Sequence, residues 1–213
     1  MERRPLKTRE KPWARALARI LVRWRVRPNS ISILSVLFAA LAGAAFLVSR
    51  DAPPMARLAL LITAAAGIQL RLLCNMLDGM VAVEGRMASK VGDVFNEFPD
   101  RVADVVILAT AGDAILRFSF APALGWCAAV FALLTAYVRV LGGSLKLEQD
   151  FRGPMAKPHR MATMTAASIL DGVAGLFGDR DYALTAALVV IVVGCLVTLF
   201  RRLRRMVVEL ESR

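Results

Sequence analysis

Two short polar stretches interrupt the long apolar runs of this chain: NMLDGMVA at residues 75–82 and GDVFNEFPD at residues 92–100. Carboxylate and amide side chains within apolar helices are costly, so each requires a reason. In the first stretch Asn75, Asp78 and Ala82 share one helix face. In the second stretch every fourth position is glycine or polar, which again marks one face. The two stretches therefore predict two helices, each with one polar face.

Both polar faces extend beyond the quoted stretches. Arg71 lies on the same face as Asp78. The face of the second helix consists of Gly92, Asn96, Asp100 and Asp104. Because the first helix ends and the second begins on the same side of the fold, we expect the two faces to meet in an oxygen-rich pocket. Gly79 and Gly92 would let a ligand approach the backbone.

The composition places these helices in a membrane. The 213 residues are 57% hydrophobic, and the net charge is +11 from 28 Lys and Arg against 17 Asp and Glu. A soluble chain of this size cannot bury so many apolar residues, and a disordered chain would contain few of them. We therefore expect the cations at a lipid surface and no nucleic-acid partner.

Six apolar stretches have about the length of a membrane-spanning helix. Three are uncharged, at residues 31–48, 118–138 and 182–200. Three are interrupted by charges, at residues 58–77, about 92–116 and 161–177. The period-two alternation of a β-barrel is absent. The sequence predicts an all-α integral membrane protein with six transmembrane helices in a catalytic domain over residues 31–200.

The basic N-terminal segment, residues 1–30, contains an amphipathic pattern over residues 12–26. Its apolar side consists of Trp13, Leu17, Ile20, Leu21 and Trp24, and Arg15, Arg19 and Arg23 lie opposite. This pattern predicts a helix in the headgroup layer; the alternative is a cytosolic helix packed on the protein itself. Pro28 ends this helix, and Asn29 or Ser30 is expected to cap the next one.

The Lys and Arg residues predict the orientation. With a cytoplasmic N-terminus and six spans, 24 of the 28 lie on the cytoplasmic side, including the basic tail over residues 201–213. The other four are Arg50, Arg57, Arg117 and Arg180. This asymmetry places both termini and the polar pocket in the cytoplasm. We expect the cytoplasmic (inner) membrane of a bacterium.

Oxygen ligands without His or Cys are typical of a hard cation such as Mg²⁺ or Mn²⁺. Such an ion commonly holds pyrophosphate and neutralises charge during phosphoryl transfer. The spacing is equally compatible with a buried pairing network, in which Asp78 would pair with Arg71 and Asp100 with Arg101. The spacing alone leaves both possibilities open.

The two stretches resemble the signature of the CDP-alcohol phosphotransferase family, D-x-x-D-G-x-x-A-R, eight residues, then G-x-x-x-D-x-x-x-D. The spacing is kept throughout, and five of the eight signature positions match. The matches are Asp78, Gly79, Ala82, Gly92 and Asp100; the departures are Asn75, Val83 and Asn96. The segment Pro28-Asn29-Ser30-Ile31-Ser32 also resembles the family's Pro-Asn-x-Ile-Thr.

The resemblance implies an activity: a substituted phosphoryl group moves from a CDP-linked donor to an alcohol, and CMP is released. It assigns the divalent metal to Asn75, Asp78, Asn96 and Asp100. It makes Asp100 the catalytic base. It places Gly79, Ala82, Gly92 and Asn29 at the nucleotide. It also suggests a homodimer.

The departures remove negative charge from the implied metal site. Asn75 and Asn96 keep a carbonyl oxygen, but each lacks the charge of Asp, so metals should bind less tightly. Glu97, Asp93 or Glu84 could compensate. Otherwise one metal is lost, or the enzyme is inactive.

Three cations are candidates for substrate phosphate: Arg139, Lys157 and Arg160. They are expected on the same side as the acidic cluster, although contact with lipid headgroups would explain them equally well. We expect a phospholipid-synthesis enzyme that transfers a phosphatidyl group from CDP-diacylglycerol to a small polar alcohol. The cations favour a phosphorylated alcohol.

Other functions remain open at the level of sequence. A CDP-amino-alcohol could donate to diacylglycerol instead, although cations near the site disfavour a cationic head group. The two Asn departures fit a catalytically impaired membrane protein that binds lipid or a partner. A transporter is disfavoured because the chain lacks two recognisable inverted halves.

Overall fold

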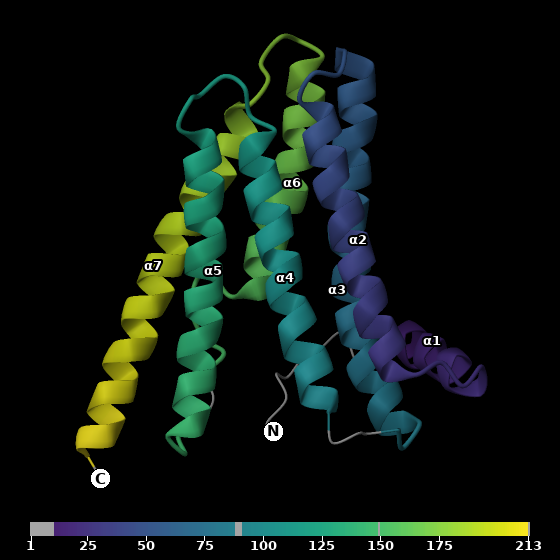
Figure 1. Ribbon diagram of the computed structural model, residues 1–213, viewed down its shortest axis with the longest axis vertical. Helices are drawn as coiled ribbons and strands as arrows, with labels where there is room; N and C mark the ends of the chain where they lie inside the picture. Colours follow the sequence, from purple (N-terminus) through teal and green to yellow (C-terminus); the bar gives the residue numbers. More distant parts are fainter. Residues whose placement is uncertain (1–10, 88–90, 149, 213) are drawn as a thin grey trace.

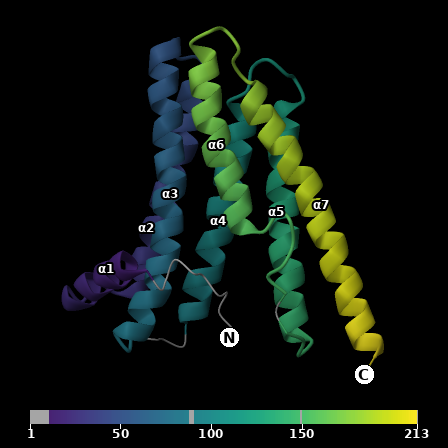
Figure 2. The same cartoon turned by 180° about the vertical axis from the view of Figure 1, so that it is seen from behind.

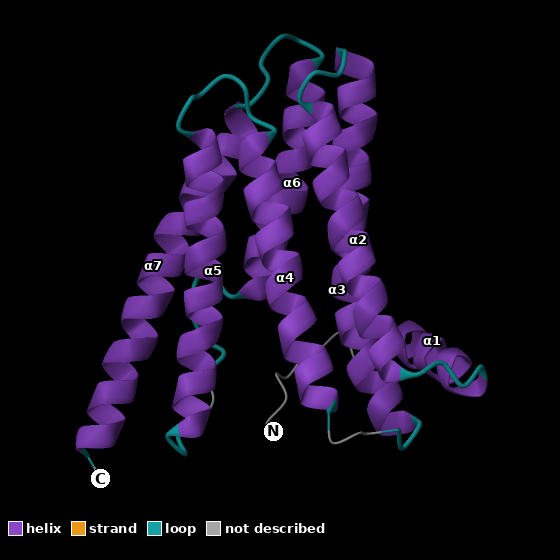
Figure 3. Ribbon diagram, in the orientation of Figure 1, coloured by secondary structure: helices purple, strands orange, loops and turns teal. Residues whose placement is uncertain are grey.

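The computed structural model describes residues 11–87, 91–148 and 150–212, and within these it leaves the side chains of residues 93 and 96 undescribed. Figure 3 shows helices and loops, and the described ranges contain no strand. The helices are α1 (Pro12–Arg23), α2 (Pro28–Ser49), α3 (Pro54–Glu84), α4 (Gly92–Asp113), α5 (Ala121–Ser144), α6 (Lys157–Gly175) and α7 (Tyr182–Glu211). The all-helical prediction is confirmed.

Helices α2 to α7 run roughly along the long axis of the molecule, and α1 lies across one end (Figure 1). Helix α2 packs against α3 and α4, α3 against α6, α4 against α5, and α7 against α5 and α6. The C-terminus lies at the same end as α1 (Figures 1 and 2). At this end α6 begins well above the tips of its neighbours, so its first residues lie inside the bundle.

Four helices, α2, α3, α5 and α7, are long and apolar enough to cross a membrane. Helix α4 carries many acidic side chains, and α6 combines charged with small polar residues, so both are less apolar. The expected membrane protein therefore fits the structure.

Proline starts most of these helices. It stands at one of the first two positions of α1, α2, α3, α5 and α6. The expected capping of α2 by Asn29 or Ser30 is wrong, because α2 begins at Pro28 and Arg27 is its N-cap without a side-chain hydrogen bond. A proline at this position has a fixed φ and lacks an N–H that would have no partner there, so no side-chain cap is required.

Helix α1 packs on the protein through small residues. Ala14 and Ala18 are fully buried in a cluster that includes Met76 and Met80 of α3. By contrast Trp24, on the expected apolar side, remains 72% exposed. The two alternatives for this helix therefore do not exclude each other: one face contacts α3, and aromatic side chains remain available to a lipid surface.

A buried ionic network fastens the end of the bundle opposite α1. Arg57 of α3 donates to Asp171 of α6 at 2.6 Å and to Asp181, just before α7, at 2.8 Å. Asp181 also accepts the backbone N–H groups of Leu116 and Arg117 in the loop between α4 and α5. The network thus links α3, α6 and the start of α7 to the loop between α4 and α5. Each of its buried charges has an oppositely charged partner, which offsets the cost of burying it.

Candidate functional site

The two polar faces meet where α3 passes α4. Asn75 donates through Nδ2 to Asp100 Oδ1, and Arg71 donates to the Asp100 carbonyl at 3.0 Å and to its Oδ1 at 3.4 Å. Arg71 is fully buried, and Asp100 is only 7% exposed. The predicted meeting of the two helix faces is confirmed.

Asp104, one turn further along α4, lies between two arginines. Arg71 Nη2 lies 2.8 Å from its Oδ1, close enough for an ion pair, and Arg160 donates to its Oδ2 at 2.9 Å. Arg160 also donates to Thr135 and to the Met155 carbonyl. The sequence analysis places Asp104 on the polar face but assigns it no role. Its position one turn after Asp100 is the signal that could have identified it as a site residue.

Lys157 is the first residue of α6, and its ammonium donates to Asp100 Oδ2. The high start of α6 inside the bundle makes this contact possible (Figure 2). Of the three cations expected at substrate phosphate, Lys157 and Arg160 are therefore bonded to acids of the α4 face. Arg160 is only 2% exposed, so its contacts are internal.

Asp78 is held from α2. Ser32 donates to its Oδ2 at 2.7 Å, and both side chains are buried. Sequence reasoning gave Ser32 no role, although the segment Pro28-Asn29-Ser30-Ile31-Ser32 had been singled out. Ser32 stands where the resembling segment has Thr, which is also a hydroxyl donor, and that was the signal that could have identified it.

A second charged group lies one turn before Asp100. Glu97 accepts from Arg101 at 2.9 Å and from Arg139 of α5 at 2.6 Å. Glu97 was expected to compensate for missing acids at the metal, but it is engaged by two guanidinium groups. Arg139 also lies over the Phe151 ring, 5.3 Å from its centroid. This group adds positive charge to the site.

One pair of the alternative network, Asp78 with Arg71, is wrong; the other, Asp100 with Arg101, is present as a long ion pair. Arg71 pairs with Asp100 and Asp104, whereas Asp78 bonds to Ser32. Arg101 is 3.9 Å from Asp100 but bonds more closely to Glu97. The reason is geometric: Arg71 reaches across to α4, while Asp78, two turns along α3, faces α2 instead.

The remaining residues assigned from the resemblance lie on the same helices as the polar group or on α2. Gly79 and Ala82 follow Asp78 on α3, Gly92 begins α4, and Asn29 is the second residue of α2; all four are half-buried. Val83, where the signature has Arg, is 61% exposed. The side chain of Asn96 lies outside the described residues.

The oxygen donors of the polar site fit one hard cation whose remaining ligands are phosphate oxygens of the substrate. The described side chains offer the carboxylates of Asp78 and Asp100 and the amide oxygen of Asn75. Among the described residues, no three His, Cys, Asp or Glu side chains are arranged so that they could hold a metal ion by themselves. Mg²⁺ commonly binds through one or two carboxylates, with water and substrate phosphates as its other ligands.

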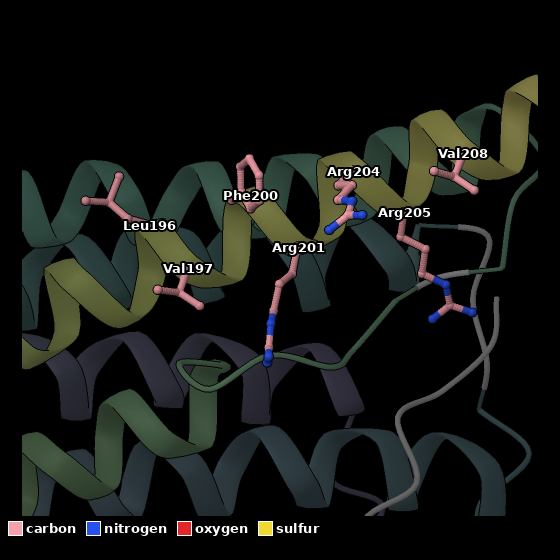
Figure 4. Close-up of a pocket in the computed structure, with 7 residues that line it drawn as sticks. All are labelled: Leu196, Val197, Phe200, Arg201, Arg204, Arg205 and Val208. Atoms are coloured by element: carbon pink, nitrogen blue, oxygen red, sulfur yellow. The ribbon is translucent and has the colours of Figure 1, made fainter.

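A separate hollow lies on the outer part of α7 (Figure 4). Its lining changes along the helix from apolar to basic: Leu196, Val197 and Phe200, then Arg201, Arg204 and Arg205, and finally Val208. None of these residues comes from α3, α4 or α6, so the hollow is distinct from the polar site. The change from apolar to basic residues is typical of a membrane boundary.

No family model matches this sequence, and no curated protein matches it. Solved structures do match. The phosphatidylinositol phosphate synthase of Mycobacterium tuberculosis, in complex with manganese and citrate, is 21% identical, with a TM-score of 0.70 over 91% of this chain and 88% of that one. The same enzyme with CDP-DAG bound is 22% identical, with a TM-score of 0.70 over 91% and 92% of the two chains.

The apo form of that synthase gives a TM-score of 0.67 at 22% identity, over 89% of this chain and 93% of the other. The likeness therefore covers nearly the whole of both chains and holds for structures with different ligands. It shows that this chain has the fold of that synthase.

Proposed function

We propose that this chain is a membrane-embedded CDP-alcohol phosphotransferase. It transfers a phosphatidyl group from CDP-diacylglycerol to a small polar alcohol and releases CMP. One observation carries the proposal: Asp100, a match to the signature, is buried and bonded to Asn75 of the facing helix, and Asp78, another match, is buried one turn after Asn75 on α3. The shared fold supports it, because the neighbour is a phosphatidylinositol phosphate synthase that was solved with CDP-DAG bound.

The charges of the site suit a pyrophosphate. Lys157 and Arg71 contact Asp100, and Arg101 and Arg139 share Glu97. Cations outnumber acids in this part of the site, so a doubly charged pyrophosphate group would be attracted to it. In the proposed pose the acyl tails of the donor lie in lipid and the cytidine lies toward Gly79, Ala82, Gly92 and Asn29.

A divalent cation, Mg²⁺ or Mn²⁺, fits the oxygen donors of Asp78, Asp100 and Asn75. When bound, it supplies positive charge to the pyrophosphate oxygens. The manganese of the neighbouring synthase supports this choice of ion. The expected contribution of Asn96 stays a proposal from the resemblance.

The proposed reaction is a displacement at the phosphatidyl phosphorus. The hydroxyl oxygen of the acceptor forms a bond to that phosphorus, the phosphorus–oxygen bond to CMP breaks, and CMP leaves with the bonding electrons. Asp100 accepts the hydroxyl proton. Each of its carboxylate oxygens has two lone pairs, so Oδ2 keeps an acceptor site beside its bond from Lys157.

The acceptor is proposed to be an anionic, phosphorylated alcohol. Arg101 lies 3.9 Å from Asp100, the proposed base, and Arg139 shares Glu97 with Arg101. A guanidinium group binds phosphate through paired N–H donors. The neighbouring protein is a phosphatidylinositol phosphate synthase, which agrees with this chemistry. The same cations disfavour the reversed reaction with a CDP-amino-alcohol, whose head group is cationic.

In the proposed membrane placement, α2 to α7 all cross the bilayer and α1 lies in the headgroup layer. Both termini and the site face the cytoplasm of a bacterium, as the Lys and Arg distribution predicts. The arginines after Phe200 on α7 would then lie at the cytoplasmic surface (Figure 4). A homodimer remains an expectation from the resemblance.

The function can be tested with purified protein in liposomes that contain CDP-diacylglycerol, Mg²⁺ or Mn²⁺ and a panel of phosphorylated and neutral alcohols. We expect CMP release by the wild type and a loss of about a hundredfold or more for Asp78→Ala and Asp100→Asn. Asp179→Asn removes an exposed acid and is the matched control. The proposal fails if no alcohol yields CMP, or if all three variants behave like the wild type.

One observation favours a second candidate, a membrane protein that binds the CDP-lipid without turning it over. Asp100 is already engaged by Lys157, Arg71 and Asn75, which occupy acceptor positions of its carboxylate. Calorimetry separates the two candidates: CDP-diacylglycerol binding without CMP release supports the binding protein.

A further inference from the structure

The innermost part of the site, without the group around Glu97, is balanced in formal charge by its own side chains. Its described acids are Asp78, Asp100 and Asp104, and its cations are Arg71, Lys157 and Arg160. Arg71, Arg160 and Asp104 are at most 2% exposed, so water screens these charges weakly. Each divalent cation that enters this group must therefore be accommodated beside cations that are already present.

Asn75 is more than a weakened metal ligand. Its amide N–H donates to Asp100, a contact that an Asp at this position could not make. Two carboxylates at that separation would repel each other unless a cation lay between them. The amide removes the need for such a cation at the α3–α4 contact.

Lys157 and Arg71 occupy the other side of the same carboxylate. The Lys157 ammonium contacts Oδ2, and Arg71 contacts Oδ1 and continues to Asp104. Arg71 also has two buried N–H groups, at Nε and Nη1, without a hydrogen-bond partner among the described residues. Buried donors of this kind are rare in proteins and are typically completed by a ligand, and an oxyanion such as phosphate would fit.

We infer that this site takes a single divalent cation and that, of the three proposed donors, Asp78 holds it. At Asp100 the Lys157 ammonium and the Arg71 guanidinium supply the positive charge that a second cation would bring. The inference rests on the proposed function in that it concerns the same site. Arg71 and Lys157 lie outside the signature. Their positive charges and the missing negative charge of Asn75 act in the same direction, because both reduce the need for a second cation at Asp100.

The test is the stoichiometry of Mn²⁺ binding, measured on purified protein from the electron paramagnetic resonance signal of free Mn²⁺. We expect one Mn²⁺ per wild-type chain. Lys157→Met should bind Mn²⁺ about tenfold more tightly, because a neighbouring positive charge is removed. The double variant Asn75→Asp with Lys157→Met should bind two. Lys146→Met, an exposed lysine, is the matched control and should behave like the wild type.

Two Mn²⁺ ions, or none, on the wild type would overturn the inference, as would a single ion on a double variant whose gel-filtration profile matches the wild type. CMP release is measured on the same samples. One ion without CMP release leaves the inference standing and refutes the proposed function. Two ions with CMP release refute the inference and leave the proposed function standing.

Discussion

At the scale of the residue, the site is defined by the ion pairs that its charged side chains form. Lys157 and Asp100 are 57 positions apart, and Arg160 and Asp104 are 56 apart. The sequence indicated that these groups lie on the same side of the molecule, but it led us to assign the two cations to substrate phosphate. In the structure both cations bond to acids of α4, because a buried charge without a partner is costly.

The bond between Ser32 and Asp78 is the contact that ties α2 to the site. We predict that Ser32→Ala lowers the free energy of unfolding by about 2 kcal/mol, because a buried hydrogen bond to a charged acceptor is lost. Ser32→Thr keeps the hydroxyl and should retain most of the stability. Reversible unfolding in mixed detergent micelles measures the difference.

Ser144→Ala is the control for this prediction. Ser144 is exposed and donates only to the Leu141 carbonyl of its own helix, so its loss should change stability by less than about 0.5 kcal/mol. Equal effects at the two serines would show that the contact with Asp78 contributes nothing specific.

At the scale of the element, the crossing of α4 and α5 depends on two glycines. A Cβ on Gly125 would lie 2.8 Å from the Gly112 Cα and 2.8 Å from the Leu108 carbonyl oxygen, both backbone atoms. Such contact between helix backbones is typical of membrane bundles, where small residues allow close packing. The crossing positions α5, and with it Arg139, beside the site.

We predict that Gly125→Ala lowers the free energy of unfolding by about 1–3 kcal/mol, because the backbones must separate. Gly142→Ala, in the same helix, is the matched control. There the nearest contact is the flexible Met206 side chain at 3.4 Å, so alanine should be neutral or stabilising by up to about 1 kcal/mol. A Gly125→Ala protein as stable as Gly142→Ala would contradict the role of this contact. Detergent unfolding curves compare the two.

At the scale of the whole molecule, the arrangement of the helices puts the loop between α4 and α5 at the opposite end from the C-terminus (Figure 1). The Lys and Arg distribution predicts that this loop is outside the cell and the C-terminus inside. Six helices between α1 and the C-terminus are consistent with both termini on one side.

A cysteine-labelling experiment tests this orientation. In a variant without Cys74, Cys127 and Cys195, we expect Ser119→Cys to react with an impermeant maleimide in intact cells, because its loop is external. Ser212→Cys, at the end of α7, should react only after permeabilisation. Both serines are exposed, so the pair is matched in accessibility. The reverse pattern of labelling would invert the proposed topology.

The sequence by itself determined the helical class, the approximate positions of seven helices and the two polar faces that meet, because periodicity and hydropathy are properties of neighbouring residues. It misjudged the α2 cap and did not identify Ser32 or Asp104 as site residues. Only the tertiary structure decided which charges pair, since this depends on the rotation and axial offset of distant helices. Helix α6 begins well inside the bundle, so its first residue, Lys157, reaches Asp100. No local pattern in residues 150–160 indicates how far along the bundle axis α6 begins.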